Sequence, residues 1–80
     1  MYEDITLDCI KPGQRGVVTN INSIGSIRRR FMDIGIIKGT QIECVGKSPM
    51  GDPSAFLIKG AVIAIRSEDS RGIVVKIYEK

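Results

Sequence analysis

Short hydrophobic runs recur along the chain, and several of them alternate with polar residues. The run "GVVTNIN" (residues 16–22) predicts a strand, because side chains in a strand point to opposite faces with a period of two. One face of it would carry Val17, Thr19 and Ile21, and the other Val18 and Asn20. The same period predicts a short edge strand at residues 5–7, a strand at 41–45, and a last strand at 73–79 with Ile73, Val75 and Ile77 on one face.

The stretch "SAFLIKGAVIAIR" (residues 54–66) is apolar except where Lys59 and Gly60 interrupt it. A helix is disfavoured there, since the apolar residues are nearly continuous and a glycine breaks them. Gly60 accepts a positive φ without a Cβ penalty, as a two-residue hairpin turn requires. The stretch therefore predicts a tight antiparallel hairpin.

One helical pattern lies between Ser23 and Gly35, and it predicts a short helix at about residues 24–34. Ser23 is placed to act as the N-cap, and Gly35 lies where a left-handed C-terminal cap is favoured. Apolar residues recur there at spacings of three, four and three, which forms one helical stripe: Ile24, Ile27, Phe31 and Ile34.

The same segment carries the arginine triplet Arg28, Arg29 and Arg30. Consecutive helical residues are about 100° apart, so the three cannot share one face. Two interpretations stay open, a solvated helix face and a contact with a partner. Asp33 is poorly placed for the helix dipole, and Arg29, four residues earlier, is a candidate to pair with it.

Five or six short strands, one helix and little room for a second layer favour a small, strongly bent sheet closed into a barrel. The expected fold is mainly β, with short antiparallel strands. We expect a single domain over residues 1–80. Glycines in the predicted turns fit this fold, because sharp bends need positive φ.

Composition and charge narrow the function. The chain has 80 residues, enough for one modest core but not for a deep substrate cleft. The formal net charge of +3 is mild, so it does not by itself indicate nucleic acid. The longest uncharged apolar run, near residues 61–65, is far too short for a membrane helix, and the acidic start "MYEDITLD" does not resemble a signal peptide. We expect a cytosolic protein.

The residues that usually carry chemistry are scarce. The chain has no histidine, and Cys9 and Cys44 are its only cysteines, so no four-ligand zinc site is indicated. We expect both cysteines to be free thiols that act as small, half-buried hydrophobes. Neither a carboxylate pair nor a glycine-rich phosphate loop is visible. We therefore expect no catalysis, no cofactor and no metal site in an isolated monomer.

The loop "KSPMGDPSAF" (residues 47–56) separates two predicted strands. Pro49 and Pro53 fix φ, Gly51 permits a turn, and Asp52 is expected to hydrogen-bond the local backbone, which describes a rigid connection. Met50 would project at the tip, where contact with another protein would give it a use. Both interpretations, connection and contact, stay open.

Several short motifs follow one another along the chain. The first is an opening pattern formed by Leu7, Pro12, Gly13, Gly16, Val18 and Ile21. The later motifs are "MDIG" (residues 32–35), "KGTQI" (38–42), "PMGDP" (49–53) and "AIR" (64–66). The order of these motifs resembles the FeoA family, the small cytosolic component of bacterial ferrous iron uptake. The similarity covers nearly the whole chain and rests on the ordered set, since each motif alone is weak.

The resemblance implies an SH3-like β-barrel, a domain type also found at the C-terminus of some iron-dependent repressors. It further implies an adaptor that binds FeoB, a membrane iron transporter with a cytosolic GTPase domain, and meets the membrane only through it. Other readings are a nucleic-acid-binding barrel that uses Lys11, Arg15 and the arginine triplet, and a regulatory module like that of the repressors. Weak self-association through a free strand edge also stays open.

Residues singled out on this basis fall into two groups. Candidates for partner contact are Arg28, Arg29, Arg30, Met50 and Asp52. Candidates for a structural role are Asp33, Gly35, Gly39, Pro49, Gly51, Pro53 and Gly60.

Overall fold

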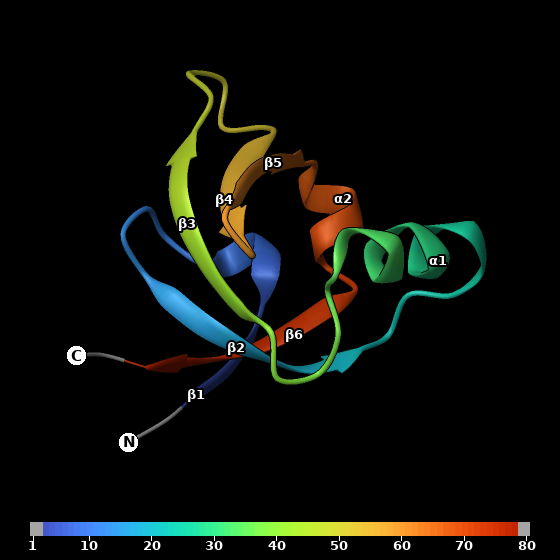
Figure 1. Cartoon of the computed structure of the whole chain (residues 1–80). Coiled ribbons are helices and arrows are strands. Elements are labelled where there is room, and N and C mark those ends of the chain that lie inside the picture. The colour runs from blue at the N-terminus through green and yellow to red at the C-terminus, as the bar shows by residue number, and fades with distance from the viewer. Residues whose placement is uncertain (1–2, 79–80) are drawn as a thin grey trace.

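The computed structural model describes residues 3–78 and contains six strands in one sheet (Figure 1). The strands are β1 (Glu3–Thr6), β2 (Arg15–Ile21), β3 (Gln41–Lys47), β4 (Ser54–Ile58), β5 (Ala61–Ile65) and β6 (Ile73–Tyr78). The helices are η1 (Leu7–Cys9, a 3-10 helix), α1 (Gly25–Ile34) and α2 (Ser67–Ser70). The predicted mainly β fold with antiparallel strands is confirmed.

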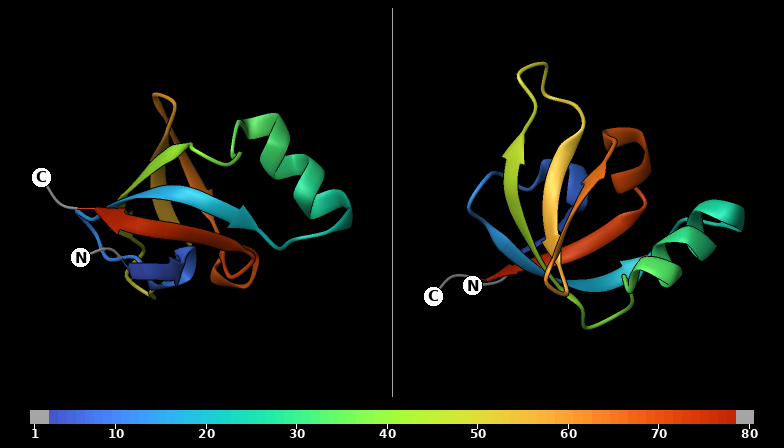
Figure 2. Two further views of the ribbon diagram at one scale, coloured as in Figure 1. Left: turned by 90° about the horizontal axis from the view of Figure 1, so that it is seen from below. Right: turned by 45° about the horizontal axis from the view of Figure 1, so that its top comes forward.

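The sheet has the order β1-β6-β2-β3-β4-β5, and every neighbouring pair is antiparallel. It bends strongly around the core, so that β3 and β4 stand across the barrel from β6, while α1 lies outside (Figures 1 and 2). Register shifts between Val18 and Asn20 and between Cys44 and Gly46 mark bulges, which increase the local bend of a strand. In this order β1 and β5 are the two edge strands.

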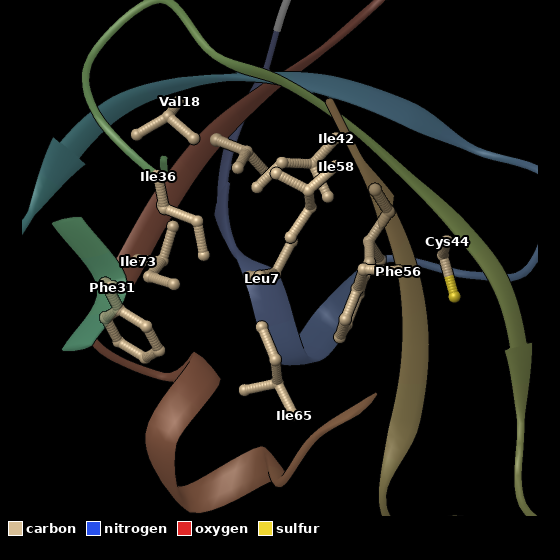
Figure 3. Packing of buried hydrophobic residues seen from close by; sticks show 12 residues of the cluster. Leu7, Val18, Phe31, Ile36, Ile42, Cys44, Phe56, Ile58, Ile65 and Ile73 are labelled. Atoms are coloured by element: carbon tan, nitrogen blue, oxygen red, sulfur yellow. The ribbon is translucent and has the colours of Figure 1, made fainter. Parts of the chain in front are cut away.

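The core is formed by apolar side chains from all parts of the barrel (Figure 3). Strand alternation supplies most of it, as the last strand shows: Ile73 and Val75 are buried, as predicted, and Ile77 packs against them. Burial of each large side chain stabilises the fold by about 1.5 to 3 kcal/mol. The buried apolar residues are Leu7, Ile10, Val18, Phe31, Ile36, Ile42, Cys44, Phe56, Ile58, Ile65, Ile73 and Val75.

The hairpin prediction for residues 54–66 is confirmed. β4 and β5 pair up to Ile58 and Ala61, and the two residues between them form the turn. Gly60 has φ +85°, and Lys59 also has a positive φ, at 50°. Positive φ at both central residues gives a primed turn, whose twist matches that of the flanking strands.

The predicted helix is present, but its N-cap is not Ser23. α1 begins at Gly25, Ile24 occupies the N-cap position, and no side chain caps the helix there. Ser23 instead packs against Gly72, because the neighbouring Asn22 N–H donates to the Gly72 carbonyl at 2.6 Å and draws the two segments together.

The C-terminal cap of α1 is confirmed at Gly35, which has φ +106°. Its N–H donates to the Met32 carbonyl at 3.0 Å, and the Ile36 N–H donates to the Phe31 carbonyl at 2.9 Å. This pair of bonds is a Schellman motif, which needs a left-handed residue at this position. Ile36 is buried beyond it and fixes the exit from the helix.

Other expectations were wrong in part. The predicted strand at residues 5–7 ends at Thr6, since the buried Leu7 begins η1. The segment after Arg66, where the sequence pattern predicts no helix, contains the short helix α2. Cys44 is fully buried but Cys9 is exposed, and both are free thiols.

Candidate partner-binding surface

All three arginines of the triplet are exposed on α1, which projects from the barrel in both views of Figure 2. Arg28 Nη1 donates to the Ile21 carbonyl at 3.1 Å, so this side chain holds the helix against the end of β2. Across residues 3–78, the side chains of Arg29 and Arg30 form no hydrogen bond and no ion pair. Two guanidinium groups are therefore available to a ligand.

The expected pair of Arg29 and Asp33 does not form, since the ion pair among the described residues joins Arg15 Nε to Glu43 Oε1 at 3.6 Å. Both Arg29 and Asp33 are exposed. An ion pair on an exposed helix face gains little free energy because water screens it. The C-terminus of α1 is held instead by its glycine cap.

The side chain of Lys59 makes a second stabilising contact at the C-terminal end of α1. A Cβ atom placed on Gly35 would lie 3.0 Å from Lys59 Cδ and 3.8 Å from Lys59 Nζ. The lysine side chain thus covers the helix terminus, where a cation is favourable to the helix dipole. A glycine is therefore needed at position 35 for two reasons: its φ is positive, and Lys59 approaches too closely to leave room for a Cβ atom.

The loop between β3 and β4 is held by hydrogen bonds within it and projects from the barrel (Figure 1). The Gly51 N–H donates to the Ser48 carbonyl at 2.8 Å, and the Ser48 N–H donates to the Pro53 carbonyl at 3.1 Å. Ser48 Oγ also donates to the Asp52 carbonyl at 2.7 Å. Met50 lies beyond these bonds with 90% of its surface exposed, so the loop presents an apolar side chain that it does not use itself.

Asp52 has a long-range structural contact that the sequence did not predict. Its Oδ1 accepts the Ser67 N–H at 2.8 Å, and its Oδ2 accepts the Ser67 hydroxyl at 3.5 Å. The predicted bond to the local backbone is therefore wrong in its partner, which lies fifteen residues away. Arg66, at the N-cap position of α2, gives no side-chain cap, so Asp52 satisfies the first turn of that helix from another loop.

A small hollow lies between α1 and β5, with a volume of about 220 Å³. Phe31 and Ile34 form its wall on α1, while Pro53 and α2 bound another side. Arg30, Arg66 and Asp69 supply the polar groups of its lining. The residues of β5 that line it are Ile63, Ala64 and Ile65. Arg30, Asp52 and Pro53 thus belong to one region, since Asp52 fixes the start of α2 beside the hollow.

A wider and more open groove of about 630 Å³ is lined by residues of β2, β3, β4 and β6 and by the turns beside them. Leu57 and Tyr78 form part of its lining, and Lys38, Lys59 and the paired Arg15 and Glu43 bring mixed charges to it. Gly39, one of the predicted turn residues, lies in its lining with φ +91°.

The described residues contain no group of three or more His, Cys, Asp or Glu side chains placed to hold a metal ion. None of the helices within residues 3–78 has the length and apolar character needed to span a bilayer.

The sequence found the two free arginines and the projecting Met50, but it missed the hollow and the bond of Asp52 to Ser67. The uncharged run of residues 61–65 becomes a signal only when the strand order places it at a sheet edge, where a strand without charge is unusual. Nothing in the sequence showed that this run is the edge.

Comparison with known proteins agrees with this fold. The FeoA domain profile matches residues 5–77. The chain is 28% identical over 65 residues to the "Fe(2+) transport protein A/Fe(2+) transporter FeoB fusion protein" of Porphyromonas gingivalis, a match that covers 81% of this chain and 8% of that protein. The chain therefore spans only a small part of this curated relative.

Solved structures give the same family. The FeoA-like protein from Clostridium acetobutylicum superposes with a TM-score of 0.89 at 32% identity, covering 100% of this chain and 93% of that one. Stenotrophomonas maltophilia FeoA, described as a prokaryotic SH3 domain protein and solved with zinc, gives a TM-score of 0.79 at 25% identity, covering 89% and 88%. The expected SH3-like barrel is thus confirmed, and the chain belongs to the FeoA family, whose named members are ferrous iron transport proteins.

Proposed function

We propose that this protein is a small cytosolic accessory protein of bacterial ferrous iron uptake that acts by binding a FeoB-type membrane transporter. One observation carries the proposal, the Porphyromonas gingivalis relative in which transport protein A and FeoB are fused in one chain. Fusion keeps two domains at high local concentration, which favours a contact between them. The proposal assigns no catalytic role to the chain, and no group of the site points to one.

The surface proposed for the contact combines α1 and the loop between β3 and β4. Arg29 and Arg30 supply unpaired positive charge, and Met50 supplies an exposed, adaptable apolar side chain. A nucleic-acid role is less well supported, because Arg15 is paired with Glu43 and the chain has few aromatic residues for base stacking.

Pull-down with the transporter of the same organism tests the proposal. The tagged protein is incubated with the full transporter in detergent and with its isolated G domain, each without nucleotide, with GDP and with a non-hydrolysable GTP analogue. We expect retention of the transporter in at least one nucleotide state. Absence of retention in every state would contradict the proposal.

Matched variants locate the contact. Arg29→Glu and Arg71→Glu make the same change of charge at exposed positions, and only the first lies on the proposed surface. We expect Arg29→Glu and Met50→Ser to weaken retention, while Arg71→Glu leaves it unchanged. If all three variants retain the transporter equally well, this surface does not form the contact.

A further inference from the structure

β5 is an edge strand with an unpaired side. It is hydrogen-bonded to β4 alone, at the end of the sheet order. In the hairpin, the pair next to the turn, Ile58 and Ala61, shares hydrogen bonds, and such pairs alternate with pairs that share none. By this alternation the backbone N–H and C=O groups of Val62 and Ala64 point away from β4. They offer a regular row of donors and acceptors.

The edge carries none of the usual protection against another strand. Natural edge strands are commonly blocked by lysine, proline or a bulge, because an open edge recruits other chains. β5 has the sequence "AVIAI" with no charge and no proline, and its register with β4 is continuous. Val62 is 64% exposed and Ala64 is exposed. An edge of this kind is a template for strand addition.

The hollow between α1 and β5 lies directly beside this edge. Ile63, Ala64 and Ile65 line it from β5, and Phe31 and Ile34 line it from α1. Its volume of about 220 Å³ is roughly seven times the 30 Å³ share of one water molecule in the liquid. A segment that pairs with β5 can therefore place an apolar side chain in it.

The charges around the hollow determine which residues are favoured beside the apolar side chain of that segment. Arg30 and Arg66 line it, and in the described part of the chain neither guanidinium has an ion-pair partner. Asp69 is the one acid in its lining. Excess positive charge at the rim favours carboxylates on the ligand and disfavours basic residues.

We propose that β5 and the α1–β5 hollow bind an extended segment of a partner protein, which adds as a strand to β5. The segment carries an apolar side chain for the hollow and acidic residues beside it for Arg30 and Arg66. The inference rests on the proposed function, and it names the chemistry by which that partner is recognised.

A second copy of this chain is a poorer occupant. Residues 54–66 contain no acidic residue, so the same hairpin of another copy brings no carboxylate to the rim. The acidic strand β1 of another copy would pair head to tail with β5, and such a contact gives rings or open filaments, which concentration-dependent self-association would reveal.

Titration of the isotope-labelled protein with designed peptides tests the inference. The probe is a capped seven-residue peptide with a central Leu-Val-Leu and two glutamates on each side. One control replaces the glutamates with lysines, and a second methylates alternate backbone nitrogens. We expect the acidic peptide to slow amide exchange at Val62 and Ala64, and each control to bind at least about tenfold more weakly.

Protein variants complete the test. Ala64→Pro removes an outward N–H at a position where an edge strand tolerates proline, and Ala64→Val keeps that N–H. Arg66→Glu is matched by Arg71→Glu, which lies outside the hollow. Binding should fall at least about tenfold in Ala64→Pro and Arg66→Glu and stay unchanged in the two controls. If Ala64→Pro does not fold, the methylated peptide tests the same bonds on the unchanged protein.

Several results would overturn the inference. Acidic and basic peptides could bind equally well, or the acidic peptide could protect the amides of β1 in place of those of β5. The protein could also self-associate with rising concentration in a way that the acidic peptide does not reverse. Finally, no peptide could bind at millimolar concentration. The two proposals fail separately. A transporter retained equally by the wild type and by Ala64→Pro contradicts the strand addition alone, and a peptide that binds β5 of a protein that retains no transporter contradicts the proposed function alone.

Discussion

At the scale of single residues, close approaches of the backbone decide which positions are sensitive. A Cβ atom on Gly72 would overlap Ser23 Oγ, while one on Gly46 would meet nothing within 4 Å. Both glycines lie outside the positive φ region, so they differ in space and not in backbone conformation. Gly72 joins the segment before α1 to the start of β6.

Replacement of Gly72 by Ala should therefore lower the free energy of unfolding by about 1 to 3 kcal/mol, the usual cost of overpacking. Urea denaturation followed by circular dichroism measures it. Gly46→Ala is the matched control and should change stability by less than about 0.5 kcal/mol. If both variants lose the same free energy of unfolding, Ser23 moves away from the added methyl group without destabilising the fold.

Asp52 is the second sensitive residue, because its carboxylate connects the loop to α2. Asp52→Ala should cost about 1 to 2 kcal/mol, as loss of a helix-capping group does. The Ser67 amide should exchange faster with solvent in this variant. Asp33→Ala removes an exposed carboxylate that has no partner among the described residues and lies at the unfavourable end of the helix dipole, so it should not lower stability or change exchange at Ser67. Unchanged exchange at Ser67 in Asp52→Ala would contradict the capping role.

At the scale of elements, α1 depends on its C-terminal cap more than on its N-terminus. Gly35 combines φ +106° with the contact of Lys59, whereas Gly25, at the start of the helix, has φ +69° and nothing within 4 Å of its Cβ position. Gly35 is therefore the more crowded of the two glycines. Its φ also lies further than that of Gly25 from the left-handed conformation, at about +57°, that other residues can adopt.

Gly35→Ala should lower the free energy of unfolding by at least about 1 to 2 kcal/mol, because a Cβ is disfavoured in this conformation and Lys59 must move. Gly25→Ala should cost less. Thermal unfolding of both variants, alone and combined with Lys59→Ala, separates the two causes. If Lys59→Ala does not reduce the difference between the two glycines, the lysine contact has no energetic part in it.

The elements also show how far the sequence could predict the structure. The hairpin and the end of α1 were predictable, since the Lys-Gly turn and the Gly35 cap act within a few residues. The start of α1 was not predictable, because the position of Ser23 depends on the hydrogen bond between Asn22 and Gly72, which are fifty positions apart in the sequence. α2 was missed for the same reason, since Asp52 supports it from a different loop.

The candidate site was predictable only in its separate parts. The arginines and Met50 were identified as exposed groups by helix geometry and loop chemistry. The hollow was not, because it exists only where the packing of Phe31 and Ile34 places α1 beside Ile63 and Ile65, about thirty residues further along the chain.

At the scale of the whole molecule, the barrel has no grouped metal ligands within the described residues. Ferrous iron bound by oxygen ligands needs several converging carboxylates, and softer sites usually need His or Cys. Anaerobic calorimetry of the isolated protein with Fe(II) should therefore show no stoichiometric binding in the micromolar range. A saturable isotherm with one iron per chain would contradict this expectation.

We propose above that the molecule acts on a transporter by binding it, and a measurement of iron flux is the sharpest test of that proposal. Fe(II) uptake is measured under anaerobic conditions in vesicles that contain the FeoB-type transporter of the same organism, alone and with increasing amounts of this protein. We expect a saturable change in the uptake rate that Arg29→Glu weakens and Arg71→Glu does not. An uptake rate that is the same with and without the protein would contradict it.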